Sequence, residues 1–273
     1  MRKSFLAAVA VCFVAATPAH AIVAGTDVPA GQYTNVAEIV IAQALGCTGT
    51  LIAPDYVMTA GHCASLTGEV IAQPIATFPA AAYDVRLGSN KSGQGTKYAV
   101  SDLVVEPQYL ARQGYDVTLL HLATPVTGIA PTPIAGPSDR GIWQPGDVQT
   151  IVGWGTTSSG GDAPDTLQKA NVPIVSDAAC EAAYGSESLG LTGYSGFEST
   201  SQVCAGDGVH DTCQGDSGGP MFATGVSGAL RLTGATSYGQ GCADPDYPGV
   251  YARVADATLR TWVGSIVPAA VAP

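Results

Sequence analysis

Apolar residues along this chain are gathered in short segments that are rich in β-branched side chains and bounded by turn-forming residues. The clearest of these segments are 37–41, 98–105, 148–154 and 230–238. Long amphipathic helical periods are nearly absent, and 34 glycines and 18 prolines are spread through the sequence. Many short strands separated by turn signals are typical of an antiparallel barrel or sandwich. The pattern therefore predicts an all-β fold.

The pattern predicts one good helix, and it lies near the C-terminus. Its apolar face consists of Leu259, Trp262, Val263 and Ile266. These positions recur at helical spacing, and Asp256 precedes them as a candidate N-cap. Far upstream, the segment 123–137 is proline-rich and uncharged, which indicates a connection between two halves of the chain.

The first 21 residues have the three parts of a secretory signal peptide. Two basic residues precede an apolar stretch over 5–16, and the small-x-small sequence of 19–21 follows it. The apolar stretch is too short to span a bilayer. We therefore expect removal of 1–21, leaving a secreted chain of 252 residues, extracellular or periplasmic, that begins at Ile22. No other run approaches transmembrane length, so we expect no membrane association after removal.

The expected mature chain is strongly acidic. The whole sequence has 11 Lys and Arg residues against 22 Asp and Glu residues. Because Arg2 and Lys3 leave with the signal peptide, 9 basic residues remain and the net charge becomes −13. Nucleic acid is not an expected partner, because phosphate neutralisation needs clustered basic residues. The acidity weakly favours cationic ligands at long range, and it serves solubility equally well.

Six cysteines remain after removal of Cys12 with the signal peptide. They are Cys47, Cys63, Cys180, Cys204, Cys213 and Cys242. An even number of cysteines in an exported chain indicates disulfides, and six cysteines allow about 15 pairings. A zinc site is not supported, because no C-x-x-C pair occurs and the spacings are wide.

The sequence GDSGG at 215–219 carries Ser217 between glycines. By letter it matches the nucleophile elbow of α/β-hydrolases, in which the acid and the histidine follow the serine along the chain. Here all three histidines of the expected mature chain, His62, His121 and His210, precede Ser217. The chain order therefore excludes an α/β-hydrolase, in agreement with the β-rich pattern.

Two other orders of acid, histidine and serine remain. The order acid, histidine, serine needs an acid before His62, and the available ones are Asp27, Glu38 and Asp55. The order histidine, acid, serine fits better, and three segments carry it: TAGHC at 59–63, YDVTLL at 115–120 and CQGDSGGP at 213–220. With these segments in this order, the chain resembles the trypsin-like serine proteases of the chymotrypsin fold, from Ile22 to the final helix.

The resemblance implies an all-β fold of two six-stranded antiparallel β-barrels packed together with a C-terminal α-helix. All of it would lie in one protease domain over 22–273. The expected parts are an N-terminal barrel over about 22–130, a C-terminal barrel over about 131–255 and a helix over about 256–267.

The resemblance also implies a catalytic triad of His62, Asp116 and Ser217. A serine hydroxyl is a weak nucleophile at neutral pH, so a base within hydrogen-bond reach must accept its proton. His62 has a suitable ordinary pKa and can later return the proton to the leaving amine. Asp116 would hold the imidazole in one tautomer and stabilise its charged form. His121 is interpreted as structural.

Substrate binding follows from the same resemblance. The backbone N–H groups of Gly215 and Ser217 would form the oxyanion hole. Asp211 would lie at the base of the primary specificity pocket, where a carboxylate pairs with an Arg or Lys side chain. Gly239 and Gly249 stand at positions where glycine keeps this pocket open. We therefore expect a serine endopeptidase that cleaves after Arg or Lys.

Two further positions bear on specificity. Thr212 could add a hydroxyl contact, but its methyl group takes volume, so the choice between Arg and Lys stays open. The sequence Ser237-Tyr238-Gly239 resembles the Ser-Trp-Gly of the family, which pairs with the substrate main chain as an added strand. Tyr238 retains an aromatic wall where Trp is commoner, so a change is expected in subsite preference at most.

By resemblance the disulfides are Cys47–Cys63, Cys180–Cys204 and Cys213–Cys242. The segment between Cys180 and Cys204 is about ten residues longer than in pancreatic-type trypsins. It either extends the binding cleft or forms a disordered surface insertion. The loop over 89–96 lacks the acidic residues that bind calcium in some relatives, so we expect no metal and no cofactor.

In this family a newly exposed N-terminal amine folds inward and pairs with the aspartate next to the catalytic serine. The corresponding pair here is Ile22 and Asp216. Ala21 stands where zymogens of the family usually have Arg or Lys. Our hypothesis is that signal peptidase itself generates the activating amine, with no zymogen stage after export.

The expected partners are protein or peptide substrates with Arg or Lys at the cleavage site, and proteinaceous inhibitors of a monomeric enzyme. Two alternatives stay open. A catalytically inactive relative could serve as a binding protein, although such proteins lose a triad residue and His62, Asp116 and Ser217 are all present. An active protease could also have another specificity if Asp211 points away from the pocket.

Overall fold

A computed structural model describes residues 22–65, 76–109, 113–185 and 196–272. The predicted signal peptide, 1–21, lies outside the described residues. Within the described part of the chain, no helix combines the length and the apolar character needed to cross a membrane.

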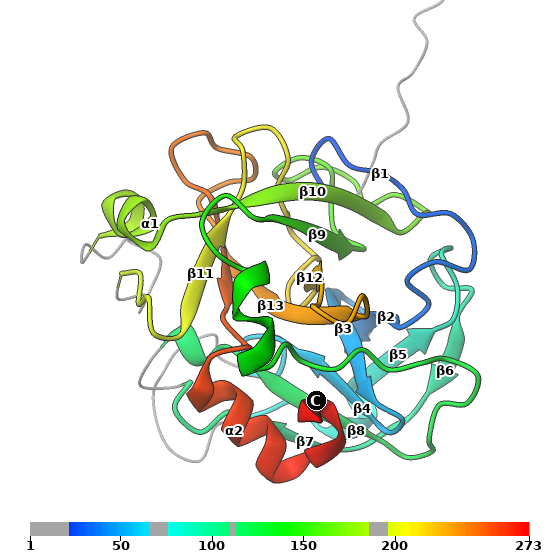
Figure 1. Cartoon of the computed structure of the whole chain (residues 1–273). Helices are drawn as coiled ribbons and strands as arrows, with labels where there is room; N and C mark the ends of the chain where they lie inside the picture. The colour runs from blue at the N-terminus through cyan, green and yellow to red at the C-terminus, as the bar shows by residue number, and fades with distance from the viewer. Residues whose placement is uncertain (1–21, 66–75, 110–112, 186–195, 273) are drawn as a thin grey trace, which may run out of the picture.

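Two antiparallel sheets of seven strands each make up most of the described structure. Figure 1 shows how their strands are arranged. The N-terminal sheet contains β2 (Val36–Ile41), β3 (Leu45–Ala53), β4 (Tyr56–Thr59), β5 (Tyr83–Leu87), β6 (Thr96–Tyr98), β7 (Val100–Val105) and β8 (Thr118–Leu122). The C-terminal sheet contains β1 (Thr26–Asp27), β9 (Val148–Gly153), β10 (Gln168–Val175), β11 (Gln202–Ala205), β12 (Pro220–Thr224), β13 (Leu230–Tyr238) and β14 (Gly249–Ala252).

The C-terminal sheet closes into a barrel of six strands. Its order is β1-β10-β11-β14-β13-β12-β9, and β9 pairs with β10 as well as with β12. The seventh strand, β1, comes from the N-terminal end of the described chain and adds to the outer edge of β10. The start of the chain is thereby attached to the C-terminal barrel.

The N-terminal sheet is an open half-barrel with the order β6-β5-β2-β3-β4-β8-β7. Its two edge strands, β6 and β7, are separated by Ala99 alone, so the two edges of the curled sheet meet at one corner. The segment 98–105, expected as one strand, is divided at this corner. The prediction of two antiparallel β-barrels with a C-terminal helix is confirmed, with one barrel closed by six strands and the other half open.

Strand formation follows the alternation of side chains seen in the sequence. In β5, Tyr83, Val85 and Leu87 are buried, whereas Asp84 and Arg86 face outward and form an ion pair of 3.0 Å. A period of two places every second side chain on the core face of a strand. The buried residues of β5 therefore join the interior cluster of the N-terminal sheet.

The predicted C-terminal helix is α2 (Ala257–Ile266), and the carboxylate of Asp256 caps it by accepting from the N–H of Thr258 at 2.8 Å. Its buried residues, Leu259 and Val263, belong to one apolar cluster with residues of both sheets. The 3₁₀ turn Pro268–Val271 follows it. The helix therefore helps to fix the two sheets relative to each other.

A second helix, α1 (Asp177–Tyr184), was not expected from the sequence. It has only eight residues, of which Cys180 and Tyr184 are buried. An isolated helix of this length is marginal in water, and tertiary contacts must stabilise it. Here the disulfide Cys180–Cys204 ties α1 to β11. Three further 3₁₀ turns lie at Ala80–Ala82, Gln113–Tyr115 and Pro137–Ile142.

Candidate active site

His62 and Asp116 lie next to each other because two antiparallel strands bring their segments together. His62 follows the end of β4, and Asp116 precedes the start of β8. These strands pair with Thr59 opposite Thr118. Continuation of the chain beyond this pair places the imidazole beside the carboxylate.

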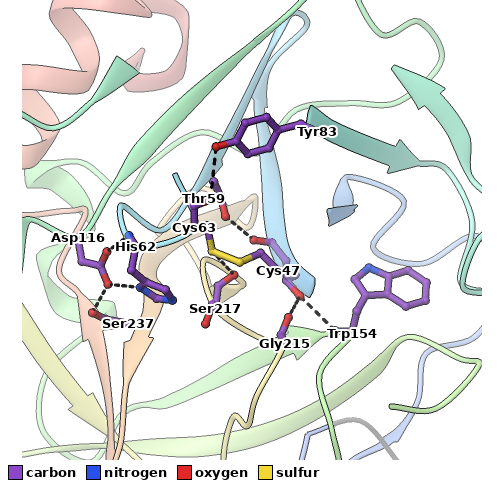
Figure 2. The surroundings of a disulfide bond; sticks show 11 residues. Cys47, Thr59, His62, Cys63, Tyr83, Asp116, Trp154, Gly215, Ser217 and Ser237 are labelled. Atoms are coloured by element: carbon purple, nitrogen blue, oxygen red, sulfur yellow. Dashed lines mark hydrogen bonds and ion pairs between the residues drawn. A yellow bond between two sulfur atoms is a disulfide. The ribbon is translucent and has the colours of Figure 1, made fainter. Parts of the chain in front are cut away.

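The carboxylate of Asp116 binds His62 twice. Oδ1 accepts from the backbone N–H of His62 at 2.8 Å, and Oδ2 lies 2.8 Å from the imidazole Nδ1, as Figure 2 shows. The hydroxyl of Ser237 donates to the same Oδ2 at 2.5 Å. Asp116 is 2 % exposed. Its carboxylate therefore fixes both the position and the orientation of the ring.

Burial lowers the pKa of His62, but the charge and the hydrogen bond of Asp116 more than offset this effect. The pKa of His62 is therefore raised above 6.5. With Nδ1–H held by the carboxylate, a neutral imidazole presents Nε2 as its basic atom. Such a ring can accept a proton and stabilise the resulting charge.

Ser217 comes from the C-terminal barrel, in the loop before β12, and lies next to the histidine segment. Its carbonyl oxygen accepts from the N–H of Thr48 in β3 at 2.8 Å and lies 3.8 Å from Sγ of Cys63. Figure 2 shows Ser217 on the same side of the Cys47–Cys63 disulfide as His62. A residue of each sheet thus contributes to one site.

Hydrogen bonds to carbonyl oxygens orient the peptide groups of the loop 214–218. The carbonyl of Gln214 accepts from the N–H of Thr156 at 2.7 Å, and that of Asp216 accepts from the N–H of Gly219 at 2.7 Å. Thr48 binds the other two carbonyls: its hydroxyl donates to Gly215 O at 2.9 Å and its N–H donates to Ser217 O at 2.8 Å. A trans peptide directs its N–H opposite to its C=O. Each of these bonds therefore fixes the direction of the following N–H.

This arrangement leaves the N–H groups of Gly215 and Ser217 available. Within the described part of the chain, neither donates to a protein acceptor. Gly215 has φ +98°, which favours glycine, and an added Cβ would lie 2.9 Å from Cα of Gly155. Two fixed, neighbouring N–H donors can bind a developing oxyanion.

A cavity of about 180 Å³ opens beside Ser217. Its lining includes Asp211, Thr212, Cys213, Gln214, Ser217, Thr236, Ser237, Tyr238, Gly239, Gly241 and Gly249. All the residues that the sequence assigned to the specificity pocket are therefore brought to one cavity, together with Ser217.

Asp211 is 4 % exposed and lines this cavity. Its Oδ1 accepts from the N–H of Thr212, and its Oδ2 from the N–H of Ala243, both at 2.8 Å. Burial nevertheless raises the pKa of Asp211 to about 6. A cation beside this carboxylate would relieve the cost of its burial.

The two glycines at the cavity differ in how closely they are surrounded. A Cβ added at Gly249 would lie 2.5 Å from Oδ1 of Asp211, so an alanine there would require this buried carboxylate to move. A Cβ at Gly239 would lie 3.8 Å from its nearest neighbour, Gly241 O, which is an ordinary contact. Gly249 therefore protects access to the carboxylate directly.

Ile22, the first described residue, and Asp216, in the loop before β12, are both buried. The Ile22 side chain is fully buried in the cluster that contains Ile151, Met221 and Tyr251, and the next N–H, of Val23, donates to Asp211 O at 2.9 Å. The Asp216 carboxylate is also fully buried, and it accepts from the N–H groups of Gly155 and Cys213. Burial raises the pKa of Asp216 to about 7.

With this geometry established, a family model and three relatives among known proteins agree on the family of the chain. The family model described as Trypsin matches residues 22–263. A Trypsin from Saccharopolyspora erythraea is 42% identical over 215 residues, covering 76% of this chain and 82% of that protein. Trypsin-1 from Astacus astacus is 36% identical, covering 85% and 95%. A Vitellin-degrading protease from Bombyx mori is 34% identical, covering 89% and 84%.

The chain belongs to the trypsin family. It is a trypsin-like serine endopeptidase, and its substrates are proteins. The resemblance inferred from the motifs is therefore confirmed. The three disulfides of this trypsin-family chain are Cys47–Cys63, Cys180–Cys204 and Cys213–Cys242, the pairs that the resemblance implied.

Sequence reasoning missed three contributors to the site of this trypsin-family protein. Thr48 binds two carbonyl groups of the Ser217 loop, and Thr156 binds a third. Ser237, expected to contact substrate through its main chain, also binds Asp116 through its hydroxyl. No local sequence signal marks these contacts, because each partner lies far away along the chain.

Further tyrosines pack behind Tyr238, the aromatic residue that lines the cavity. Tyr184 packs edge-on against Tyr238 and Tyr247, with ring centroids 5.5 Å and 5.6 Å apart, and its hydroxyl donates to Pro248 O at 2.7 Å. Tyr184 lies in α1, before the segment 186–195, which is outside the described residues. The expectations for the long loop between Cys180 and Cys204 therefore remain predictions.

The other two histidines have their own acidic neighbours. His121 Nε2 lies 3.5 Å from Asp55, and His210 Nδ1 lies 2.8 Å from Asp207. Both are more exposed than the His62–Asp116 pair. Among the described residues, no group of three or more His, Cys, Asp or Glu side chains is arranged to hold a metal ion.

Proposed function

We propose that this trypsin-family endopeptidase cleaves peptide bonds after Arg or Lys, through a triad of His62, Asp116 and Ser217. The observation that carries the proposal is the buried carboxylate of Asp211 in a narrow cavity beside Ser217. A cationic side chain in that cavity would place the following carbonyl carbon at the serine.

Acylation would begin when Nε2 of His62 accepts the proton of the Ser217 hydroxyl. The serine oxygen then attacks the substrate carbonyl carbon and forms a tetrahedral intermediate. His62, now charged, is stabilised by Asp116. It gives its proton to the leaving amine, and the acyl group stays on Ser217. Water then repeats these steps, releases the acid and restores the hydroxyl.

The negative charge of each tetrahedral intermediate would fall on the oxygen that faces Gly215 and Ser217. Their N–H groups are proposed as the oxyanion hole. The support is that hydrogen bonds already hold the surrounding peptides, so little reorganisation is needed when charge develops.

Specificity is assigned to Asp211 and the glycines beside it. A neutral residue in the cavity would leave the carboxylate buried without a counter-charge, whereas Arg or Lys would pair with it. Thr212 and the aromatic wall at Tyr238 complete the cavity. Comparison of the turnover of arginyl and lysyl reporters decides the preference between Arg and Lys.

Activation is assigned to the amine of Ile22 after removal of 1–21 during export. Pairing of this amine with Asp216 would lower the cost of burying that carboxylate, whose pKa is otherwise raised to about 7. The support is the burial of the Ile22 side chain and the bond from Val23 to Asp211.

We also propose that the mature chain is a secreted monomer, in which about 22–130 and about 131–255 supply the two barrels, apart from β1, which joins the C-terminal one, and about 256–267 the final helix. Its partners are then protein substrates with Arg or Lys at the cleavage site, and proteinaceous inhibitors. Secretion is supported by the three disulfides, because disulfides form and persist in oxidising compartments outside the cytosol.

The test uses the processed chain with arginyl, lysyl and phenylalanyl peptide reporters that differ in one residue. We expect rapid turnover of the first two and little of the third, with the preference lost in Asp211→Ser. Gly46→Ala is a control, because a Cβ there meets nothing within 4 Å. Faster cleavage of the phenylalanyl reporter would contradict the proposed specificity. Absence of labelling of Ser217 by an organophosphate would favour an inactive binding protein instead.

A further inference from the structure

We infer that the hydroxyl of Thr48 is a positioning group that holds the oxyanion-binding loop in its reactive conformation. The inference rests on the proposed role of the Gly215 and Ser217 N–H groups. Thr48 belongs to the N-terminal sheet, whereas the loop that it binds precedes β12 of the C-terminal sheet. The family motifs around His62 and Ser217 do not include Thr48.

Thr48 lies in β3 and is fully buried, with four hydrogen bonds made by three of its groups. Its hydroxyl donates to Gly215 O at 2.9 Å and accepts from Trp154 N at 3.2 Å. Its N–H donates to Ser217 O at 2.8 Å, and its carbonyl accepts from the hydroxyl of Thr59 at 2.8 Å. One residue is thus bonded to both ends of the segment 215–217.

Gly215 needs an external restraint of this kind. With φ +98° and no Cβ, its backbone has wide conformational freedom. The N–H of Gly215 lies in the preceding peptide group, and the φ and ψ of Gly215, which set how the rest of the loop is turned relative to that N–H, depend on the two peptide groups that flank the residue. Thr156 fixes the preceding one through Gln214 O, and the Thr48 hydroxyl fixes the following one through Gly215 O. Without the hydroxyl, one of these two restraints is lost.

The same residue connects the loop to the histidine segment. Thr59, whose hydroxyl binds Thr48 O, is three residues before His62. Gly218 packs closely here, since a Cβ on it would lie 2.2 Å from Oγ1 of Thr59 and 2.7 Å from Thr48 O. Thr48 therefore joins the segment that carries the base to the loop that carries the serine.

Loss of the hydroxyl should weaken binding of the transition state more than binding of the substrate. The Gly215 N–H has its greatest effect when negative charge develops on the carbonyl oxygen. The cationic side chain of a substrate instead contacts Asp211, which is anchored by Thr212 and Ala243. The expected signature is a lower kcat with little change in KM.

The experiment compares Thr48→Val, which keeps the shape and loses the hydroxyl, with Thr48→Ser, which keeps the hydroxyl. Thr233→Val is the matched control. Thr233 is also buried, and its hydroxyl has two acceptors within reach of its one proton, Gln149 Oε1 at 2.8 Å and Met221 O at 2.9 Å, outside the site. Active-site titration restricts the kinetics to folded, reactive molecules, and Thr48→Ala replaces the valine variant if the latter does not fold.

For Thr48→Val, we expect kcat on an arginyl amide to fall about 10- to 100-fold, with KM nearly unchanged. Affinity for a peptidyl-arginine aldehyde, which adds the serine hydroxyl to form a tetrahedral hemiacetal, should fall by a similar factor. Affinity for benzamidine, a cation that occupies only the pocket, should stay the same. Thr48→Ser and Thr233→Val should retain wild-type ratios.

Equal losses for the aldehyde and benzamidine would overturn the inference, because they would indicate general distortion of the pocket. Wild-type kcat in Thr48→Val or Thr48→Ala would overturn it as well. Failure of the proposed specificity is seen separately, as absence of arginyl turnover by the unmodified protein. In that case the aldehyde of the preferred residue replaces the arginyl one, and the Thr48 comparison still applies.

Discussion

The Asp116 carboxylate binds His62 through both of its oxygens. Oδ1 accepts from the backbone N–H of His62, and Oδ2 lies within hydrogen-bond distance of the imidazole Nδ1, both at 2.8 Å. The two contacts have different consequences. The backbone bond fixes where the residue lies, and the ring bond fixes which nitrogen carries the proton. A change at Asp116 therefore tests the tautomer of His62 and not only the charge beside it.

Asp116→Asn should lower kcat about 10⁴-fold while leaving the fold intact, because an amide NH₂ facing Nδ1 favours the wrong tautomer. Steady-state kinetics on an arginyl reporter measure the change. The matched control is Asp55→Asn at the second histidine–aspartate pair, where Asp55 lies 3.5 Å from His121. A comparable loss in Asp55→Asn would contradict the assignment of the triad.

The activity should fall as pH decreases through the pKa of His62. The base must be neutral to accept the proton from Ser217, and the pKa of His62 is raised above 6.5 because Asp116 offsets the effect of burial. The acid limb of kcat/KM should therefore have its midpoint above 6.5. An arginyl reporter followed from pH 5 to 8 gives this midpoint, and a value at or below 6.5 would argue against the His62–Asp116 contact in the active enzyme.

Binding of a cationic inhibitor should weaken below pH 6. Burial raises the pKa of Asp211 to about 6, so the carboxylate becomes neutral as pH falls through that value. Because only the charged form attracts benzamidine, its dissociation constant should increase by about tenfold per pH unit in the acid range. Calorimetric titration at several pH values measures it. Asp211→Ser should bind benzamidine weakly at every pH. If the affinity of this variant still fell with pH, the pH dependence would come from a group other than Asp211.

Gly249→Ala should close the specificity pocket. Its Cβ would lie 2.5 Å from Oδ1 of Asp211, on the path that a cationic side chain must take. Overpacking of this kind costs about 1–3 kcal/mol, so KM for an arginyl substrate should rise about 10- to 100-fold. Gly239→Ala, whose nearest contact would be 3.8 Å, should have a smaller effect on KM. A larger rise in KM for Gly239→Ala than for Gly249→Ala would contradict this prediction, because it would place the path of the substrate side chain next to Gly239.

An additional residue before Ile22 should remove most of the activity. In the proposed activation it would keep the amine from pairing with Asp216, whose carboxylate would then stay without a counter-charge at a raised pKa of about 7. N-terminal sequencing together with the arginyl assay tests this point. The normal enzyme should also lose activity in alkali. Pairing raises the pKa of the amine above its ordinary value of about 7.7–8.0, so the pair is complete below that value and is lost as pH rises through the raised pKa. Full activity of the extended chain would refute the activation hypothesis.

The local pattern of the sequence was sufficient for the strand-forming segments, for α2 with its cap at Asp256 and for the family. Alternation along β5 and helical spacing in α2 are properties of neighbouring residues, so they can be recognised without a structure. The motifs around His62 and Ser217 are equally local. The helix α1 was missed because eight residues carry too little periodicity, and its burial depends on a disulfide to β11.

Only the tertiary structure decided how these segments act on one another. It left the N-terminal sheet as a half-barrel whose edge strands meet only at Ala99. It also brought the hydroxyls of Thr48 and Ser237 to partners more than a hundred residues away in the chain. The raised pKa values of Asp211 and Asp216 have the same origin, because desolvation depends on everything packed around a carboxylate. Sequence alone determined which chemical groups this protein carries. Distances and burial, which arise only when remote segments pack together, determined which of those groups are held in place to act.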